Sequence, residues 1–448
     1  MNSVRRQVFI AAHRRMAGLS LIEMMIALIM ALIVAAGIVS VFASTSSSNK
    51  VQQQMATLQE EGRFAIHSLR TDLANANGTY CSNTGGNAGG TTSGLFLDSL
   101  RSPTVYGKTA ISFPDNTVTL ADPTAAYSLP SSIFMRGYDC DTSSCTPVDP
   151  SGTATKIPAM GKTVGDRVPG AAVLTMRYLK PGSGWAIVDS SSAKGTKITA
   201  GSDGSVTTIT LGQLPGEPAT SSSSAFTGTP ALALLADCSN GQVFEVKNAS
   251  GVLTPNNNYA VPRDITRGAA PRVFDFSTDF QTITYYLRVA DAGNGHTTGE
   301  LVRMVNDGTP QALVRGVERL DFLYGIIDAN GNTKFLTANQ VDTDTDAGGS
   351  TIPCPPGVPI DGGMGNSGCL WRAVKTVQVN ILMDGQTPMY TLTPDEMKYI
   401  YSPDGSAGGV TPAAPDVHPV KPNADQGFPK ELLRREFTTL VSLRNFNP

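Results

Sequence analysis

The hydrophobic and polar positions predict a membrane helix near the N-terminus. Met24 to Ala43 form an apolar run of 20 residues without a charge. As a helix, this run is long enough to cross the roughly 30 Å hydrocarbon core of a bilayer. The preceding residues 1–18 carry four arginines and no acidic residue, which favours keeping this end in the cytoplasm and the rest of the chain outside. Glu23 stands at the edge of the run, where an unpaired carboxylate costs roughly 2.5 kcal/mol or more. We therefore expect a spanning helix whose glutamate has a partner.

The helical pattern continues beyond the apolar run. After the polar residues 44–49, apolar side chains recur at steps of three and four, at Val51, Met55, Leu58, Ala65, Ile66, Leu69, Leu73 and Ala76. Glutamine, glutamate and arginine fill much of the opposite side, so this part is amphipathic with one buried stripe. Asn77-Gly78 is a natural stop, because glycine readily takes the left-handed conformation of a C-cap.

Strict alternation replaces the helical period in the second half of the chain. Apolar and polar residues alternate over 282–289, 377–381 and 437–444, which is typical of half-buried antiparallel strands. Further strand candidates are Ala171–Leu179, Val206–Leu211, Gln242–Lys247, Arg272–Phe276 and Leu301–Val305. The predicted fold class is α+β. One long N-terminal helix packs on an enlarged antiparallel β-sheet domain over residues 78–448, built as one domain or as two lobes.

The composition fits an exported protein with many turns. Only 16% of the residues are charged, while 45 are glycine and 29 proline, a mix that favours strands joined by long loops. The net charge is −3 for the whole chain and falls to −7 without the four leader arginines. This acidic balance argues against nucleic acid as a partner.

The cysteines are interpreted as disulfides. The orientation predicted for the helix places most of the chain outside the cytoplasm, where compartments are oxidising. Six cysteines are candidates: Cys81, Cys140, Cys145, Cys238, Cys354 and Cys369. Short loops favour pairing Cys140 with Cys145 and Cys354 with Cys369, which leaves Cys81 with Cys238, although the sequence leaves other connectivities open. A metal site is less favoured because no Cys-x-x-Cys occurs and the four histidines stand singly.

Candidate chemistry is sparse elsewhere. The sequence contains no P-loop, no His-Glu-x-x-His and no nucleophile elbow, so we expect no enzyme activity and no cofactor. Asp342, Asp344 and Asp346 alternate like the first ligands of a calcium loop. The sixth position is Ala347 rather than glycine and the twelfth is Pro353 rather than glutamate, which favours a solvated acidic loop over a calcium site.

The N-terminal residues carry a family resemblance. The stretch Gly18-Leu19-Ser20-Leu21-Ile22-Glu23, with its basic leader and apolar run, resembles the class III signal of type IV prepilins and pseudopilins. The resemblance implies that a prepilin peptidase removes residues 1–18 and methylates the new N-terminus at Leu19. Glu23 then becomes the fifth residue and pairs with the terminal amine of a neighbouring subunit. Residues 19–43 form the transmembrane and assembly half of the helix, and residues 44–77 its amphipathic half. The family more often has phenylalanine than Leu19. An ordinary secretory signal and a plain signal anchor are the alternatives.

Later stretches resemble the PilW group of minor pilins. The first is Gly62-Arg63-Phe64-Ala65-Ile66, followed by Leu69, Asp72 and Leu73. The others are Ala236-Asp237-Cys238, Leu313–Glu318, Phe322–Gly325 and Arg434–Asn445. Residues 82–156, 201–229 and 341–367 are expected to be insertions of this chain.

The resemblance implies a structural rather than a catalytic function. Such proteins join other minor pilins and the major pilin, prime pilus assembly from the inner membrane, and sit at the pilus tip, sometimes beneath an adhesin. The chain is then a single-pass inner membrane protein with a periplasmic domain. A minor pseudopilin of a type II secretion system and a pilus-borne binding module for adhesion or DNA uptake are the alternative functions.

Overall fold

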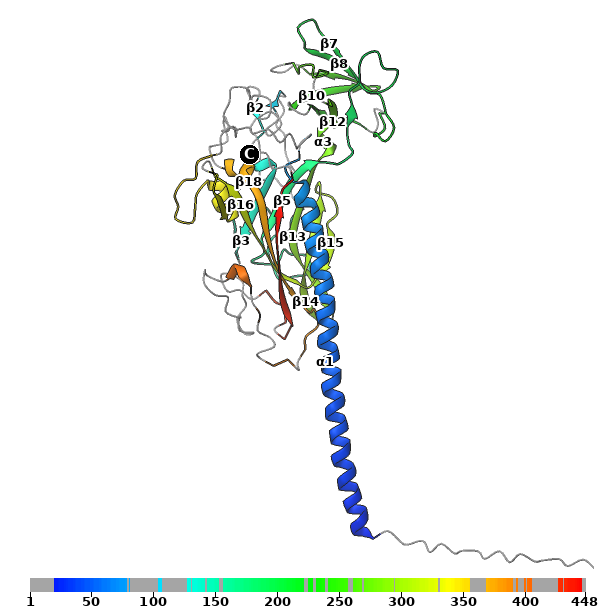
Figure 1. The fold of residues 1–448 in the computed structure, drawn as a ribbon, viewed down its shortest axis with the longest axis vertical. Coiled ribbons are helices and arrows are strands. Elements are labelled where there is room, and N and C mark those ends of the chain that lie inside the picture. The colour runs from blue at the N-terminus through cyan, green and yellow to red at the C-terminus, as the bar shows by residue number, and fades with distance from the viewer. Residues whose placement is uncertain are drawn as a thin grey trace, which may run out of the picture. The chain divides into compact units, whose positions relative to one another are not determined.

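A long helix and antiparallel sheets make up the protein, as the α+β prediction requires (Figure 1). The computed structural model describes residues 20–78, 80, 104–106, 127–129, 131–141, 143–152, 156–220, 225–228, 231–237, 241–256, 261–267, 270–293, 295–328, 331–354, 368–389, 392–393, 399, 401–404, 426–429 and 431–444. The predicted cleavage site at Gly18 and Leu19 lies outside these residues, as do Cys81 and Cys238. The described part divides into two compact units. The first ends at Gln54, and the second begins at Met55.

The first unit consists of the N-terminal part of helix α1 (Leu21–Asn75). This part is apolar and long enough to cross a membrane, as predicted. The weak helix formers of 44–49 do not interrupt α1. Thr45 donates its hydroxyl to the carbonyl of Val41 at 2.8 Å, a bond to the fourth preceding residue that satisfies a polar side chain within a helix.

The second part of α1 belongs to the β-rich unit. Its buried residues are Leu58, Gly62, Ala65, Leu69, Asp72 and Leu73, which largely follow the predicted stripe. The helix ends at Asn75, and the left-handed residue after it is Asn77, with φ of 62°, rather than Gly78. Asparagine tolerates this conformation better than most residues. The Asn77 N–H then donates to the carbonyl of Arg177 at 3.2 Å, which joins the end of the helix to a strand.

A six-stranded antiparallel sheet lies beside this part of the helix (Figure 1). Its order is β15 (Gln311–Arg315), β14 (His296–Val305), β13 (Phe280–Gly293), β5 (Val173–Leu179), β3 (Met135–Cys140) and β4 (Cys145–Thr146). The register places Tyr285 between Leu174 and Arg303. Side chains of the helix-facing surface therefore come from residues far apart in the sequence.

The prediction that β13 is half-buried is wrong. Its polar-patterned face is buried as well, with Thr282, Thr284 and Tyr286 at most 3% exposed. Part of that face is covered by described residues from between β4 and β5, because Ile157 packs with Tyr286 in one apolar cluster. Val168 lies instead at the edge of β13, where its N–H donates to the Leu287 carbonyl at 3.0 Å. The two buried threonine hydroxyls are satisfied internally, because Thr284 bonds to Thr175 and Thr282 accepts from Arg177. Threonine in an alternating strand thus marked a covered face rather than a solvated one.

A four-stranded antiparallel sheet contains the C-terminal segment. Its order is β17 (Thr333–Leu336), β16 (Val317–Ile327), β18 (Val374–Asp384) and β19 (Arg434–Ser442). Val377, Val379 and Ile381 are buried as their alternation predicts. Ile381 pairs with Phe437 of β19, so both side chains lie on the same face of the sheet.

The third sheet has nine strands among the described residues, and both of its faces are buried at β9. The main path is β6 (Trp185–Ala186), β12 (Arg272–Asp275), β9 (Ala231–Ala236), β10 (Gly241–Ala249), β11 (Val252–Pro255), β8 (Val206–Thr210) and β7 (Lys197–Ala200). Strands β1 (Thr104–Val105) and β2 (Tyr127–Ser128) complete it, and β1 pairs with β10 in parallel. Leu234 belongs to one apolar cluster and Leu235 to another, so successive residues of β9 enter opposite cores.

Short helices connect these strands. They are η1 (Ser131–Ile133), α3 (Phe276–Asp279), α4 (Ala338–Thr343), η2 (Cys369–Ala373) and η3 (Ser402–Asp404). The segments 201–229 and 341–367, expected to be loop insertions, contain β8 and the second half of α4 respectively.

Candidate functional site

The apolar part of α1 presents a surface that nothing in its own unit covers. Large apolar side chains are exposed from Leu21, at 77%, to Phe42, at 74%. An exposed apolar surface of this extent marks a membrane or protein contact. Glu23 is exposed in the first turn, and its N–H donates to the Ser20 carbonyl at 3.0 Å. A carboxylate here is favoured by the helix dipole and is free to meet a cation from another molecule.

The opposite end of α1 is fixed to the β-rich unit by a buried carboxylate. Asp72 accepts two hydrogen bonds from Arg303, from Nε at 2.6 Å and from Nη2 at 3.1 Å. Tyr178 donates its hydroxyl to Oδ1 at 2.8 Å, and Tyr285 donates to Oδ2 at 2.6 Å. We call these four residues the Asp72 cluster. The helix is thereby bonded to β5, β13 and β14 through one side chain.

The electrostatics of the Asp72 cluster keep its donors protonated. Burial and the neighbouring Asp72 charge raise the pKa of Tyr178 and Tyr285 above their ordinary range. Hydrogen bonding to Asp72 raises the pKa of Arg303. Bidentate pairing of arginine with a carboxylate is among the stronger polar contacts in proteins. The cluster is therefore a fixed attachment point and has no free proton acceptor for chemistry.

Three further contacts hold the middle of α1 against β19 and the residues after β18. Gly62 allows close approach, because a Cβ at this position would lie 2.5 Å from Cζ of Phe437. About two turns earlier, Arg435 contacts the sulfur of Met55 at 3.6 Å. Gln386 donates to Glu61 at 2.9 Å. Close packing against Phe437 thus explains the glycine in the Gly62–Ile66 motif.

A second buried ion pair joins the C-terminal strand to β16. Arg434 donates from Nε to Glu318 at 2.6 Å and from Nη2 at 3.2 Å, and Glu318 is fully buried. Asp384 lies nearby with its Oδ1 accepting from the Gln386 N–H at 2.7 Å. Burial, followed by the Glu318 charge, raises the pKa of Asp384 to about 7.

Replacing Asp384 with asparagine should flatten the pH dependence of stability. The folded state holds a proton on Asp384 up to about pH 7, whereas an unfolded aspartate loses it near pH 4. Stability from this group therefore falls as the pH rises from about 4 to 7. The neutral amide removes that loss, so the gain of Asp384→Asn over the wild type should be larger at pH 8 than at pH 5. Denaturant unfolding at both pH values measures it; an equal difference at both would contradict the assignment.

The three aspartates of the acidic loop meet separate donors. Arg136 and the Trp371 indole N–H both donate to Asp342. Asp344 accepts from the Leu370 N–H at 3.2 Å. Asp346 accepts from the N–H groups of its own turn, Gly348 and Ser350. Each carboxylate thus has a structural role in the described residues.

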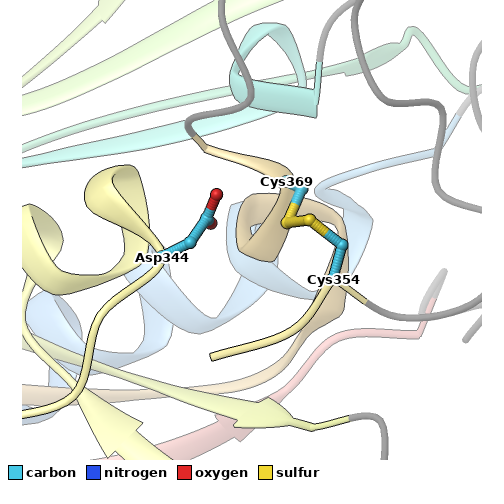
Figure 2. A group of neighbouring side chains, drawn as sticks. All are labelled: Asp344, Cys354 and Cys369. Carbon is cyan, nitrogen blue, oxygen red and sulfur yellow. A yellow bond between two sulfur atoms is a disulfide. The ribbon is translucent and has the colours of Figure 1, made fainter. Parts of the chain in front are cut away.

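Asp344 also lies beside the disulfide that joins Cys354 to Cys369 (Figure 2). One carboxylate oxygen and the two sulfur atoms lie within 4.8 Å of one another. The sulfurs are bonded to each other and are not the thiolates that a metal requires. The other disulfide of the described residues joins Cys140 to Cys145. These are the two pairings that the short loops predict.

Sequence reasoning did not find the partners of Asp72 and Glu318. The motif singled out Asp72, but Tyr178 and Arg303 were not candidate residues. Their signal is faint: Arg303 is the single charge in the apolar segment Leu301–Val305, which offers no polar face for it. A charge at such a position requires an opposite charge from another element.

The comparison with known families covers the last third of the chain. Residues 284–445 match the family model of the type IV pilus-assembly protein W. No curated protein and no solved structure matches the chain at a significant level. The matched residues include Tyr285, Arg303, Glu318 and Arg434, whereas α1 and the nine-stranded sheet lie outside them.

Proposed function

We propose that this protein is a minor pilin of the PilW type that helps to prime type IV pilus assembly. The observation that carries the proposal is the combination of two features in one chain. Residues 284–445 match a pilus-assembly family, and an uncovered apolar helix begins with Glu23. The function follows from association of helices and requires no catalysis.

Processing comes first in the proposed mechanism. Prepilin peptidase cleaves after Gly18 and methylates Leu19, so that Glu23 becomes the fifth residue. The subunit then stays in the inner membrane through the apolar part of α1, with its β-rich unit in the periplasm. The basic leader supports this orientation.

Assembly follows when α1 joins the helices of other minor pilins and of the major pilin. Within the bilayer the Glu23 carboxylate pairs with the N-terminal amine of a neighbouring subunit. The Asp72 cluster and Gly62 support this step, because they fix the same helix to the β-rich unit. Such a complex sits at the pilus tip, where it can lie beneath an adhesin.

Replacing Gly18 with valine should block processing. The peptidase requires a residue without a bulky side chain before the cut, so the mass of the protein in cells should stay that of the full chain. Leu19→Phe is the matched control, because it brings the position closer to the family pattern and should be cleaved after residue 18. Intact mass of both purified variants measures the outcome. Removal of residues 1–18 from Gly18→Val would contradict the cleavage site.

A minor pseudopilin of a type II secretion system is the second candidate. It would share the leader and the apolar helix, so only the later residues discriminate. The match of residues 284–445 to a pilus-assembly protein favours the pilus. Cross-linking of the mature protein in membranes tests the choice: recovery with secretion-system subunits and without pilins would favour the second candidate.

A further inference from the structure

The two disulfides of the described residues lie in opposite electrostatic surroundings. Arg167 directs Nη1 at both sulfurs of the first, 3.0 Å from Cys140 and 3.1 Å from Cys145. The second disulfide, between Cys354 and Cys369, has the carboxylate of Asp344 beside its sulfurs instead (Figure 2). A disulfide needs no cation, so the placement of a guanidinium against the first one calls for a chemical reason.

Arg167 is held in this place by several bonds. It is fully buried. Its Nε donates to the carbonyl of Pro158 at 3.2 Å, and its Nη2 donates to Asp149 at 2.9 Å. An arginine keeps its charge in proteins. The cation is therefore preorganised at the sulfurs before any reaction occurs.

A cation at this position stabilises a thiolate more than it stabilises a disulfide. Arginine next to a cysteine lowers the pKa of the thiol, and a thiol of lower pKa leaves faster in thiol–disulfide exchange. Cys140 is partly exposed, whereas Cys145 is 7% exposed. Cys140 is the more exposed residue of the pair, so we expect an incoming thiolate to attack its sulfur and Cys145 to be the leaving group. Arg167 lies beside the sulfurs of both.

We propose that Cys140–Cys145 is a thiol–disulfide exchange site, which dithiol proteins of the Cys-x-x-Cys class open and close, while Cys354–Cys369 is a structural disulfide. The inference concerns residues outside the matched segment and holds whichever filament the helix enters.

The exchange proceeds in two steps. A thiolate of the dithiol attacks Sγ of Cys140, the bond between the two cysteines breaks, and the bonding electron pair leaves on Sγ of Cys145. The second thiol of the partner loses its proton and attacks the mixed disulfide, which releases Cys140 and leaves the partner as a disulfide. Two electrons pass from the partner to the cysteines, and two protons accompany them in the fully protonated products. The reverse steps close the site.

Opening the bond removes a cross-link beside residues that pack on the six-stranded sheet. Cys140 ends β3 and Cys145 begins β4, and Cys145 and Ile157 pack with Tyr286 in one apolar cluster. Loss of the cross-link should loosen this packing. Amide hydrogen exchange within residues 141–170 should increase in the reduced protein, without the same change in the strands beneath.

The test is the rate at which dithiothreitol opens each disulfide in the folded, detergent-solubilised protein. Samples are alkylated at intervals, and mass spectrometry assigns the modified cysteines. Cys140 and Cys145 should be modified at least tenfold faster than Cys354 and Cys369.

Arg167→Met should slow the opening of the first disulfide by about tenfold, and Arg167→Lys should restore most of the rate. Asp149→Asn removes the counter-charge of Arg167 and keeps an oxygen that accepts from its Nη2, so on the same reasoning it should not slow the opening. Equal rates for the two disulfides in the wild type would overturn the proposal.

A second measurement serves if Arg167→Met loosens the fold and opens faster for that reason. In Cys140→Ser the thiol of Cys145 is free, and the pH dependence of its alkylation gives its pKa. That pKa should lie below the ordinary thiol value of about 8.5 and return toward it when Arg167→Met is added. A Cys145 pKa at or above about 8.5 in the single variant would overturn the proposal.

Discussion

Replacing Asp72 with alanine should lower the free energy of unfolding by about 3 kcal/mol. Removing one partner of a buried ion pair costs roughly 3–5 kcal/mol, because the other charge is left buried and unpaired. The lower end applies, since the Arg303 side chain is 24% exposed and regains some water. The hydroxyl of Tyr178 loses its acceptor at the same time, and an unsatisfied buried donor is itself destabilising. The hydroxyl of Tyr285 keeps the Ser68 carbonyl as an acceptor at 3.3 Å. Denaturant unfolding of the detergent-solubilised protein, followed by tryptophan fluorescence, measures the change.

Arg70→Ala is the matched control for this prediction. Arg70 lies two residues earlier on α1 and is exposed, so its loss should change stability by no more than about 0.5 kcal/mol. The pair Asp72→Leu with Arg303→Met should lose less than the two single changes together, because the double variant leaves no unpaired charge. Equal stability of Asp72→Ala and Arg70→Ala would mean that the cluster does not hold the helix.

Helices and strands were predictable where apolar positions repeat with one clear period. The helix follows from an apolar run and then a three- and four-residue repeat, and both depend only on neighbouring residues. Strands β5, β8, β10, β12 and β14 overlap the predicted segments for the same reason. Disulfides with short loops were also accessible, since Cys140 and Cys145 are 5 residues apart. Local pattern sufficed in each of these cases.

The contacts that fix the helix were not predictable, because they depend on register between distant segments. Asp72 meets Tyr178, Tyr285 and Arg303 only once β5, β13 and β14 are aligned. The buried polar face of β13 was missed for a related reason: Ile157 packs with Tyr286 from a Gly- and Pro-rich segment, and such a segment gives no periodic sign of what it covers. Likewise, nothing local to Arg167 indicates that it faces two sulfurs.

Two parts of α1 have different roles, and these contacts explain the difference. The β-rich unit covers one stripe of the helix from Leu58 onward, and contacts at Gly62 and Asp72 fix the helix in place. The part before Gln54 keeps its apolar surface exposed. Residues that stabilise the subunit are therefore separate from those available for association. A substitution in the first turn of α1 can alter assembly without unfolding the protein.

Glu23→Ala should test that separation directly. Loss of the carboxylate removes a membrane cost of roughly 2.5 kcal/mol or more, so the protein should still insert and accumulate in the inner membrane. Glu23 makes no side-chain contact among the described residues that folding would lose, and its exposed position leaves the β-rich unit unchanged. Incorporation into pili should nevertheless fall at least tenfold, because a neighbouring N-terminal amine loses its counter-charge. A tenfold fall requires a loss of only about 1.4 kcal/mol in the free energy of association. Quantitative immunoblots of sheared pili and of membranes give the ratio of protein in pili to protein in membranes.

Glu60→Ala changes an exposed glutamate on the same helix. It is the matched control and should incorporate normally. Glu23→Asp, which keeps the charge on a shorter side chain, should lie between the two. If Glu23→Ala enters pili as well as Glu60→Ala does, the glutamate has no pairing role, and the apolar surface of α1 alone directs assembly.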